Sequence, residues 1–293
     1  MNDMQTKANT AYYIKKFSYR STFRNILPYV ALTILSLIFI FPFVWMVSTS
    51  LRTFQEASSL SISLVPKDII WSNYIDIFVR IPLFRYILNT LFITVTCVIG
   101  HLLSSSLTAY GISHIDWKGK NIVFILVLAT MMIPIQVTMI PLYIIFNKLG
   151  MIGSYLPLIL PAFFGSGGLY IFLTRQFFLT IPQSLIQAAK IDGASEFRIY
   201  WQIIIPLSKP ALATVGMFVF LYTWSDFTNP LIYLQNPKSY TISLGLYAFI
   251  SERYVEWQYL MGASVVFTIP IIIMFFVAQK QFIEGITVTG IKG

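Results

Sequence analysis

Residues 187–195 read QAAKIDGAS, a short polar stretch in a chain that is otherwise largely apolar. Pro182 lies before the stretch, Pro206 lies after it, and Gly193 directly follows an aspartate. Proline is tolerated in the first turn of a helix, and glycine is common just past the last turn. Between them, Leu185 and the two alanines repeat at helical spacing. We therefore expect a short helix that begins at Pro182 and stops at Gly193.

A second amphipathic helix is expected after the glycine. Its apolar positions recur at helical intervals and are Phe197, Tyr200 or Trp201, and Ile204. The two helices form an elbow, by which we mean the helix–turn–helix within residues 175–209. Ala188 and Ala189 are small enough to let a partner approach closely, while the aromatic positions would hold the elbow against its own bundle. The pattern alone fits either a docking surface or an interfacial helix lying in the lipid headgroups.

The surrounding composition is that of an integral membrane protein. Hydrophobic residues make up 57% of the 293 residues, charged residues only 11%, and the mean hydropathy is +0.74. Soluble domains carry about 25% charged residues. The formal charge of +9 would suggest nucleic-acid binding in a soluble protein. In a membrane protein it instead raises the question of which side carries the lysines and arginines. No nucleic-acid partner is expected.

Apolar stretches long enough to cross a membrane, which takes about 20 residues, occur six times. The expected spans are approximately 26–48, 86–112, 121–146, 153–174, 210–232 and 258–279. They form a permease-sized domain over residues 26–280, preceded by a basic N-terminal tail, 1–25, and followed by a C-terminal tail, 281–293. The first span is too long for a signal peptide and lacks a cleavage pattern, so we expect it to be retained. The fold class is therefore an all-α membrane protein with six transmembrane helices.

An even number of spans places both chain ends on one side of the membrane. That side, which also carries the elbow, holds about two thirds of the 20 lysines and arginines. Basic residues are enriched in cytoplasmic loops, so both termini and the elbow are expected to be cytoplasmic.

Sequence motifs for enzyme chemistry are absent. There are two histidines without metal-ligand spacing, no phosphate-binding G-x-x-x-x-G-K-[ST] loop and no G-x-S-x-G elbow. We expect no catalytic residue and no metal site. Two ionisable residues are functional candidates, His101 within the second span and Asp226 near the end of the fifth. Each also has a structural interpretation: a helix–helix hydrogen bond for His101 and an outer helix end for Asp226. Cys97 is expected to be a small buried residue.

The elbow resembles the EAA motif of ABC-importer permeases, E-A-A-x-x-x-G-x(9)-I-x-L-P. The matching residues are Ala188, Ala189, Gly193, Ile203 and Pro206. Other stretches resemble the MalG-like permeases of carbohydrate importers: MMIPIQVTMIPLYIIFNKLGMI (131–152), WSDFTNPLIYL (224–234) and the ending GITVTGIKG (285–293). The resemblance covers nearly the whole chain and implies the architecture of a type I ABC-importer permease.

The resemblance also implies roles for particular residues. The elbow would be a coupling helix that docks on an ATPase subunit through Gln187, Ala188, Ala189, Asp192, Gly193 and Ala194. Lys292 and Gly293 would reach the ATPase from the tail. Gln187 replaces the family's glutamate, so docking here would depend on shape more than on charge. The resemblance assigns no substrate-binding residue in this chain.

Partners follow from the same resemblance. They are a second, MalF-like permease, a dimer of ABC ATPase subunits that binds ATP and Mg²⁺, an extracytoplasmic binding protein and membrane lipid. This chain would hold no cofactor itself and would lie in a bacterial cytoplasmic membrane. The expected cargo is an oligosaccharide, either neutral like a maltodextrin or acidic like an alginate fragment. The alternatives are a polyol or glycerophosphodiester permease, and a self-sufficient secondary transporter or channel.

Overall fold

The computed structural model describes residues 26, 28–59, 63–251 and 253–290, with side chains as far as residue 279. The basic N-terminal tail and the tail residues Lys292 and Gly293 therefore lie outside the described residues. The described chain folds into helices, and the β-type pairing within it is one isolated bridge between Ile250 and Val255. The prediction of an all-α fold is confirmed.

Four helices are individually long and apolar enough to cross a membrane: Pro28–Ser50, Leu83–Ser113, Leu156–Phe178 and Trp257–Gln279. Two bent pairs also qualify when each pair is taken together: Lys120–Thr130 with Ile135–Lys148, and Glu196–Leu207 with Lys209–Ser225. If each bent pair is one span, the described residues contain six candidate spans, the number expected from the sequence. In the second pair, Glu196–Leu207 is bent by 79° from Lys209–Ser225 and belongs to the elbow.

The helices of the bundle are α4 (Leu83–Ser113), α5 (Lys120–Thr130), α6 (Ile135–Lys148), α7 (Leu156–Phe163), α8 (Gly168–Phe178), α12 (Lys209–Ser225) and α15 (Trp257–Gly290). The elbow comprises α9 (Gln183–Ile191), α10 (Glu196–Ile199), a π-helical turn (Tyr200–Ile204) and α11 (Ile205–Leu207). Short helices at the opposite end are α2 (Phe54–Ala57), α3 (Ser72–Arg80), α13 (Thr228–Tyr233) and α14 (Ile242–Gly245), with 3₁₀ turns at Pro237–Ser239 and Leu246–Phe249.

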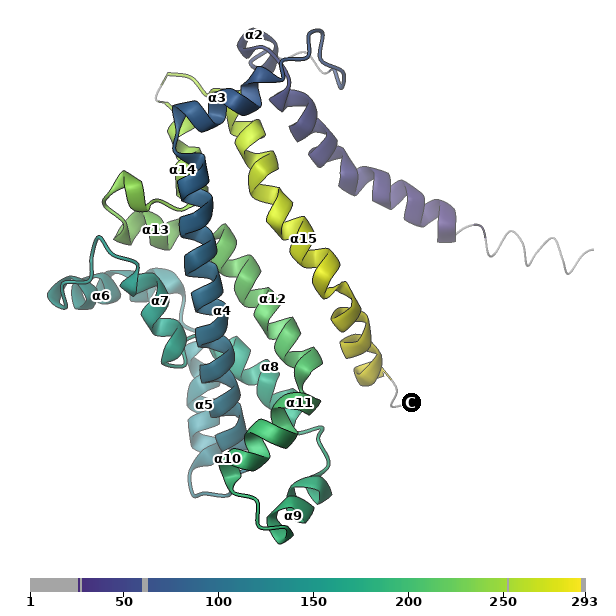
Figure 1. Ribbon diagram of the computed structural model, residues 1–293, viewed down its shortest axis with the longest axis vertical. Coiled ribbons are helices and arrows are strands. Elements are labelled where there is room, and N and C mark those ends of the chain that lie inside the picture. The colour runs from purple at the N-terminus through teal and green to yellow at the C-terminus, as the bar shows by residue number, and fades with distance from the viewer. Residues whose placement is uncertain (1–25, 27, 60–62, 252, 291–293) are drawn as a thin grey trace, which may run out of the picture.

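Helix α4 is the central element of the bundle (Figure 1) and packs against α12, α8 and α7. Three clusters of buried side chains follow one another along it. Tyr86 belongs to the first cluster, near α3 and α14; Ile93 and Cys97 belong to the second; Tyr110 belongs to the third, beside the elbow. Helices gain little hydrophobic energy by leaving lipid, so van der Waals packing along α4 must hold them together. The long helix thus connects the elbow physically to the opposite end of the molecule.

The third span is bent by 99° between α5 and α6. Pro134 is the residue before α6, with φ −60° and ψ 138°, an extended conformation that ends helical geometry. Proline lacks an N–H and disfavours helical backbone at the residue before it, so the ladder of hydrogen bonds stops at this point. The sequence places the proline in the span, but the size of the bend is visible only in the structure.

The fifth span is shorter than the expected range 210–232. Helix α12 ends at Ser225, and Asp226 takes extended backbone with ψ 118°. The Asp226 carboxylate accepts a hydrogen bond from the backbone N–H of Asn229 at 3.1 Å, at the start of α13. Asp226 therefore satisfies a backbone N–H in the first turn of the next helix instead of continuing its own. Its structural interpretation as a helix end is correct, and helix α12 stops short of residue 232, the limit expected for the fifth span.

Close packing of α5 against α8 depends on Gly168. A Cβ atom at this position would lie 2.8 Å from the backbone oxygen of Val127 and 2.9 Å from Cγ of Met131. A backbone oxygen cannot move aside as a flexible side chain can, so overpacking here is expected to separate the two helices.

We therefore expect Gly168→Ala to lower the thermal unfolding temperature of the purified protein, at a cost of about 1–3 kcal/mol. Gly111→Ala is the matched control, because a Cβ at Gly111 in α4 meets nothing within 4 Å. That variant should be neutral or stabilising, since alanine favours helix over glycine. Equal melting temperatures for the two variants would show that the α5–α8 contact is not tight.

Candidate functional site

The elbow lies at the lower end of the bundle in Figure 1, where α9 extends past α4 while α10 and α11 lie beside its last turns. Helix α9 ends in the turn at Gly193, whose φ of +77° lies in the left-handed region that favours glycine. The Gly193 N–H donates to Lys190 O at 3.1 Å, and the Ala194 N–H donates to Ala189 O at 2.9 Å. This pair of bonds is a Schellman motif, which satisfies the last carbonyls of the helix. The predicted stop at Gly193 is where the structure ends α9.

The second helix of the elbow begins immediately afterwards. The Ser195 side chain accepts a hydrogen bond from the Arg198 N–H at 3.3 Å and caps α10. With the glycine turn before it and the cap after it, the path of the chain between the two helices is defined by backbone hydrogen bonds. The elbow is therefore a structured joint and not a flexible linker.

Buried side chains fasten the elbow to the bundle. Ile186, Ile199 and Ile204 are fully buried, and they form one cluster with Tyr110 of α4 and Phe178 of α8. Tyr200 joins the cluster, and its hydroxyl lies 2.8 Å from the Ser106 hydroxyl. The elbow thus cannot tilt without disturbing α4 and α8.

The anchoring residues differ in part from those expected. Tyr200 and Ile204 are buried as predicted, but Phe197 and Trp201 are 69% and 55% exposed. In α9 the buried position is Ile186, and Leu185 is exposed. The helical spacing was correct but its phase was not, because the neighbouring ends of α4 and α8 decide which face is covered.

An acidic residue that sequence reasoning missed holds the two elbow helices together. Glu196 Oε1 lies 2.6 Å from Lys190 Nζ of α9, and Oε2 accepts a 2.6 Å hydrogen bond from the Tyr110 hydroxyl of α4. The Lys190 ammonium, and after it the Tyr110 hydroxyl, lower the pKa of Glu196, so the carboxylate is ionised at neutral pH. We call these three residues the Glu196 clamp, and it joins α9, α10 and α4.

His114, just past the end of α4, packs against this joint. Its ring stacks on Phe178 with a centroid distance of 6.3 Å and lies 5.8 Å from Tyr110. Burial lowers the pKa of His114 below its usual range, so the imidazole is neutral at neutral pH. The imidazole therefore adds no charge of its own beside the Glu196–Lys190 ion pair.

The outward face of the elbow contains most of the residues that the EAA resemblance implies. Gln187, Ala188, Asp192 and Gly193 are exposed, while Ala189 and Ala194 are half-buried. Ala189 and Ala194 pack against the anchoring cluster and do not lie fully on the outer face. Ile191 is 86% exposed at the tip of α9 and was not singled out from the sequence.

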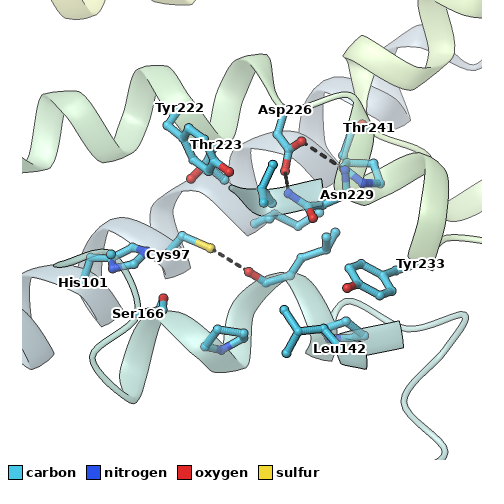
Figure 2. A pocket seen from close by; sticks show the side chains of 18 of the residues that line it. Cys97, His101, Leu142, Ser166, Tyr222, Thr223, Asp226, Asn229, Tyr233 and Thr241 are labelled. Atoms are coloured by element: carbon cyan, nitrogen blue, oxygen red, sulfur yellow. Dashed lines mark hydrogen bonds between the residues drawn. The ribbon is translucent and has the colours of Figure 1, made fainter. Parts of the chain in front are cut away.

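The remaining candidates lie together elsewhere. Cys97, His101 and Asp226 all line one cavity of about 440 Å³ (Figure 2). Cys97 is buried as predicted and its thiol donates to Leu158 O at 3.3 Å. His101 meets the neighbouring helix through an edge-to-face contact with Tyr170, 4.8 Å between centroids. The sequence suggested His101 and Asp226 separately as functional candidates, and the fold brings them to one cavity together with the buried Cys97.

Comparison with known proteins identifies the architecture. Residues 101–287 match the family described as binding-protein-dependent transport system inner membrane components. The chain belongs to this family. The resemblance first seen in the EAA motif is thereby confirmed.

Two relatives align with most of the length of this permease. It is 35% identical to the arabinooligosaccharides transport system permease protein AraQ of Bacillus subtilis over 271 residues, 90% of this chain and 96% of AraQ. It is 33% identical to the galactooligosaccharides transport system permease protein GanQ of the same organism, over 94% of this chain and 98% of GanQ. A crystal structure of a bacterial ABC transporter involved in import of the acidic polysaccharide alginate matches with a TM-score of 0.77 at 25% identity. That match covers 87% of this chain and 95% of the other.

Proposed function

We propose that this permease is a transmembrane subunit of an ATP-driven oligosaccharide importer in a bacterial cytoplasmic membrane. The observation that carries the proposal is the elbow, whose outer face is bare while its inner face is locked to α4 and α8. Its similarity to AraQ and GanQ supports oligosaccharides as the cargo. We place the elbow and both termini in the cytoplasm, on the basis of the basic residues.

The elbow would act as the coupling helix. Gln187, Ala188, Asp192 and Gly193 would enter a groove on an ATPase subunit, with Ile191 as the apolar anchor. Movement of that ATPase would be passed through the Glu196 clamp and the buried cluster to α4. The ATPase subunits would hold ATP and Mg²⁺, a second, MalF-like permease would complete the pathway, and a binding protein would deliver the sugar. The tail residues Lys292 and Gly293 would add a second contact with the ATPase.

Reconstitution tests this function. The permease is co-expressed with its second permease and its ATPase, and the complex is placed in proteoliposomes with the cognate binding protein. We expect labelled arabinotriose or galactotriose to accumulate only with enclosed ATP on the ATPase side. A catalytically inactive ATPase is the control. Solute movement by this chain alone, without ATPase subunits, would instead support a secondary transporter or channel.

A further inference from the structure

The cavity described above lies beside α4 and is bordered by α6, α7, α12 and α13. At about 440 Å³ it is within the size range of small-molecule sites, roughly 300–1,000 Å³. Figure 2 shows Cys97 and His101 at one end, with Asp226, Asn229 and Tyr233 facing the space from α13 and the segment before it. These residues come from segments distant in the sequence, so the cavity is a product of the fold.

From these features we propose that the cavity binds one or two units of a neutral, hydroxyl-rich sugar and disfavours acidic sugars. The inference rests on the proposed function and adds a substrate class to it. It also assigns sugar contacts to this subunit, for which the sequence suggested no binding residue.

Asp226 and Asn229 provide the hydrogen-bonding wall. Asp226 Oδ2 accepts the Asn229 side-chain N–H at 2.7 Å, and Oδ1 accepts the Asn229 backbone N–H at 3.1 Å. A carboxylate offers about four lone-pair sites, so each oxygen retains capacity for a sugar hydroxyl. The rest of the Asn229 amide lies beside Tyr222, a second hydrogen-bonding group of the lining. This arrangement provides donors and acceptors side by side, which suits adjacent hydroxyl groups.

Tyrosine rings form much of the remaining polar lining. Tyr170, Tyr222 and Tyr233 all border the cavity, and Tyr233 is held between Tyr143, stacked at 6.4 Å, and Phe146, edge-on at 5.5 Å. A ring held in this way offers an apolar face and a hydroxyl tip at little entropic cost. Sugars likewise have apolar C–H faces and hydroxyl edges. The C–H faces can pack against the tyrosine rings, and the sugar hydroxyls can form hydrogen bonds with the tyrosine hydroxyls.

His101 gives an independent indication of a polar ligand. The side chain is only 9% exposed, and its Nδ1 atom has no hydrogen-bond partner within the described part of the chain. A buried polar atom without a partner is costly, which calls for a bound group or water. A hydroxyl can donate or accept and would therefore satisfy either tautomer of the ring.

The charge of the cavity selects the class of sugar. Asp226 lines it, whereas no lysine or arginine is found among its described lining residues. A uronate or phosphate entering this space would meet a carboxylate without a compensating cation in this subunit. Like charges repel strongly where water is scarce, so acidic oligosaccharides and glycerophosphodiesters are disfavoured.

Saturation-transfer NMR on the purified importer complex, without binding protein, tests the inference separately from transport. The probes are arabinotriose and galactotriose as neutral sugars and trigalacturonate as the acidic one. We expect binding of a neutral sugar and a signal at least about fivefold weaker for trigalacturonate. Asn229→Ala should weaken neutral binding about tenfold, as expected for lost hydrogen bonds. Asp226→Asn should reduce the difference in binding signal between the neutral sugars and trigalacturonate.

Asp68→Asn is the control, because Asp68 is an exposed carboxylate outside the cavity lining. Its binding should match that of the unmodified complex. Absence of neutral binding, equal binding of trigalacturonate, or full binding by Asn229→Ala would each overturn the cavity assignment. An importer that transports normally while failing these tests would leave the proposed function standing. A complex without ATP-dependent uptake would contradict that function itself.

Discussion

Gly193→Pro is expected to abolish ATP-driven uptake while the protein still inserts into the membrane. Proline fixes φ near −65°, whereas the native φ of Gly193 is +77°. Proline also removes the N–H that bonds to Lys190 O at the end of α9. The turn would have to rearrange, and the exposed face of α9 would point elsewhere. We expect uptake to fall by about 20-fold or more, with less ATPase co-purifying with the permease.

Gly193→Asn is the matched control for the turn, because asparagine tolerates left-handed backbone. No neighbouring atom lies within 4 Å of a Cβ at this position, so the added side chain has space in the isolated chain. We expect this variant to retain the turn and most of the activity. If both variants coupled ATP hydrolysis to uptake normally, the elbow would have no docking role.

The Glu196 clamp carries the second large prediction. Glu196→Ala removes the 2.6 Å contacts to Lys190 and to the Tyr110 hydroxyl together. The buried cluster would still hold both elbow helices, through Ile186 of α9 and Ile199 of α10, but the polar link that fixes the position of α9 against α4 would be lost. We expect ATP hydrolysis to continue, with sugar transported per ATP hydrolysed falling about fivefold. The measurement is parallel ATPase and uptake rates in the same proteoliposomes.

Two further variants test whether the effect of Glu196→Ala is specific to the clamp. Tyr110→Phe keeps the ring in the buried cluster and removes one arm of the clamp, so its effect should be intermediate. Glu256→Gln disrupts an ion pair with Arg80, 2.8 Å apart and at the opposite end of the bundle, and serves as the control. A Glu256 effect as large as that of Glu196→Ala would indicate general loosening instead of a coupling defect.

Acidification should open the same clamp without mutation. The pKa of Glu196 is lowered in the folded protein, so the contribution of the clamp is present above the ordinary carboxyl pKa. This contribution is lost as the pH falls through the lowered pKa of Glu196 in the folded protein, because the protonated acid no longer forms an ion pair with Lys190. Coupling in the wild-type importer would therefore be insensitive to pH near neutrality.

Much of the fold was readable from the sequence because it depends on local quantities. The length and hydropathy of apolar runs indicate six spans, since a bilayer imposes a minimum helix length. The elbow turn was equally readable, because glycine at position 193 follows a helical pattern and supplies the left-handed conformation that the turn needs. The size and direction of the bend after α5 could not be predicted, because a proline indicates where a helix breaks but not the direction of the chain after the break.

The contacts of the candidate sites depend on distant parts of the chain. Tyr110 and Glu196 are far apart in the sequence, and no local pattern distinguishes Glu196 from an ordinary exposed acid in a first helical turn. Likewise, the choice of Ile186 over Leu185 as the buried position follows from where α4 and α8 end. Helical spacing indicates that a face exists, but only the neighbouring helices decide which face it is.

The sequence by itself determined the membrane class, the all-α fold and the position of the elbow, because each is encoded in the composition or spacing of neighbouring residues. The tertiary structure decided that Glu196 bridges the elbow to α4, and that His101 and Asp226 share one cavity. These depend on packing between helices, where shape and hydrogen-bond geometry select partners that are remote along the chain.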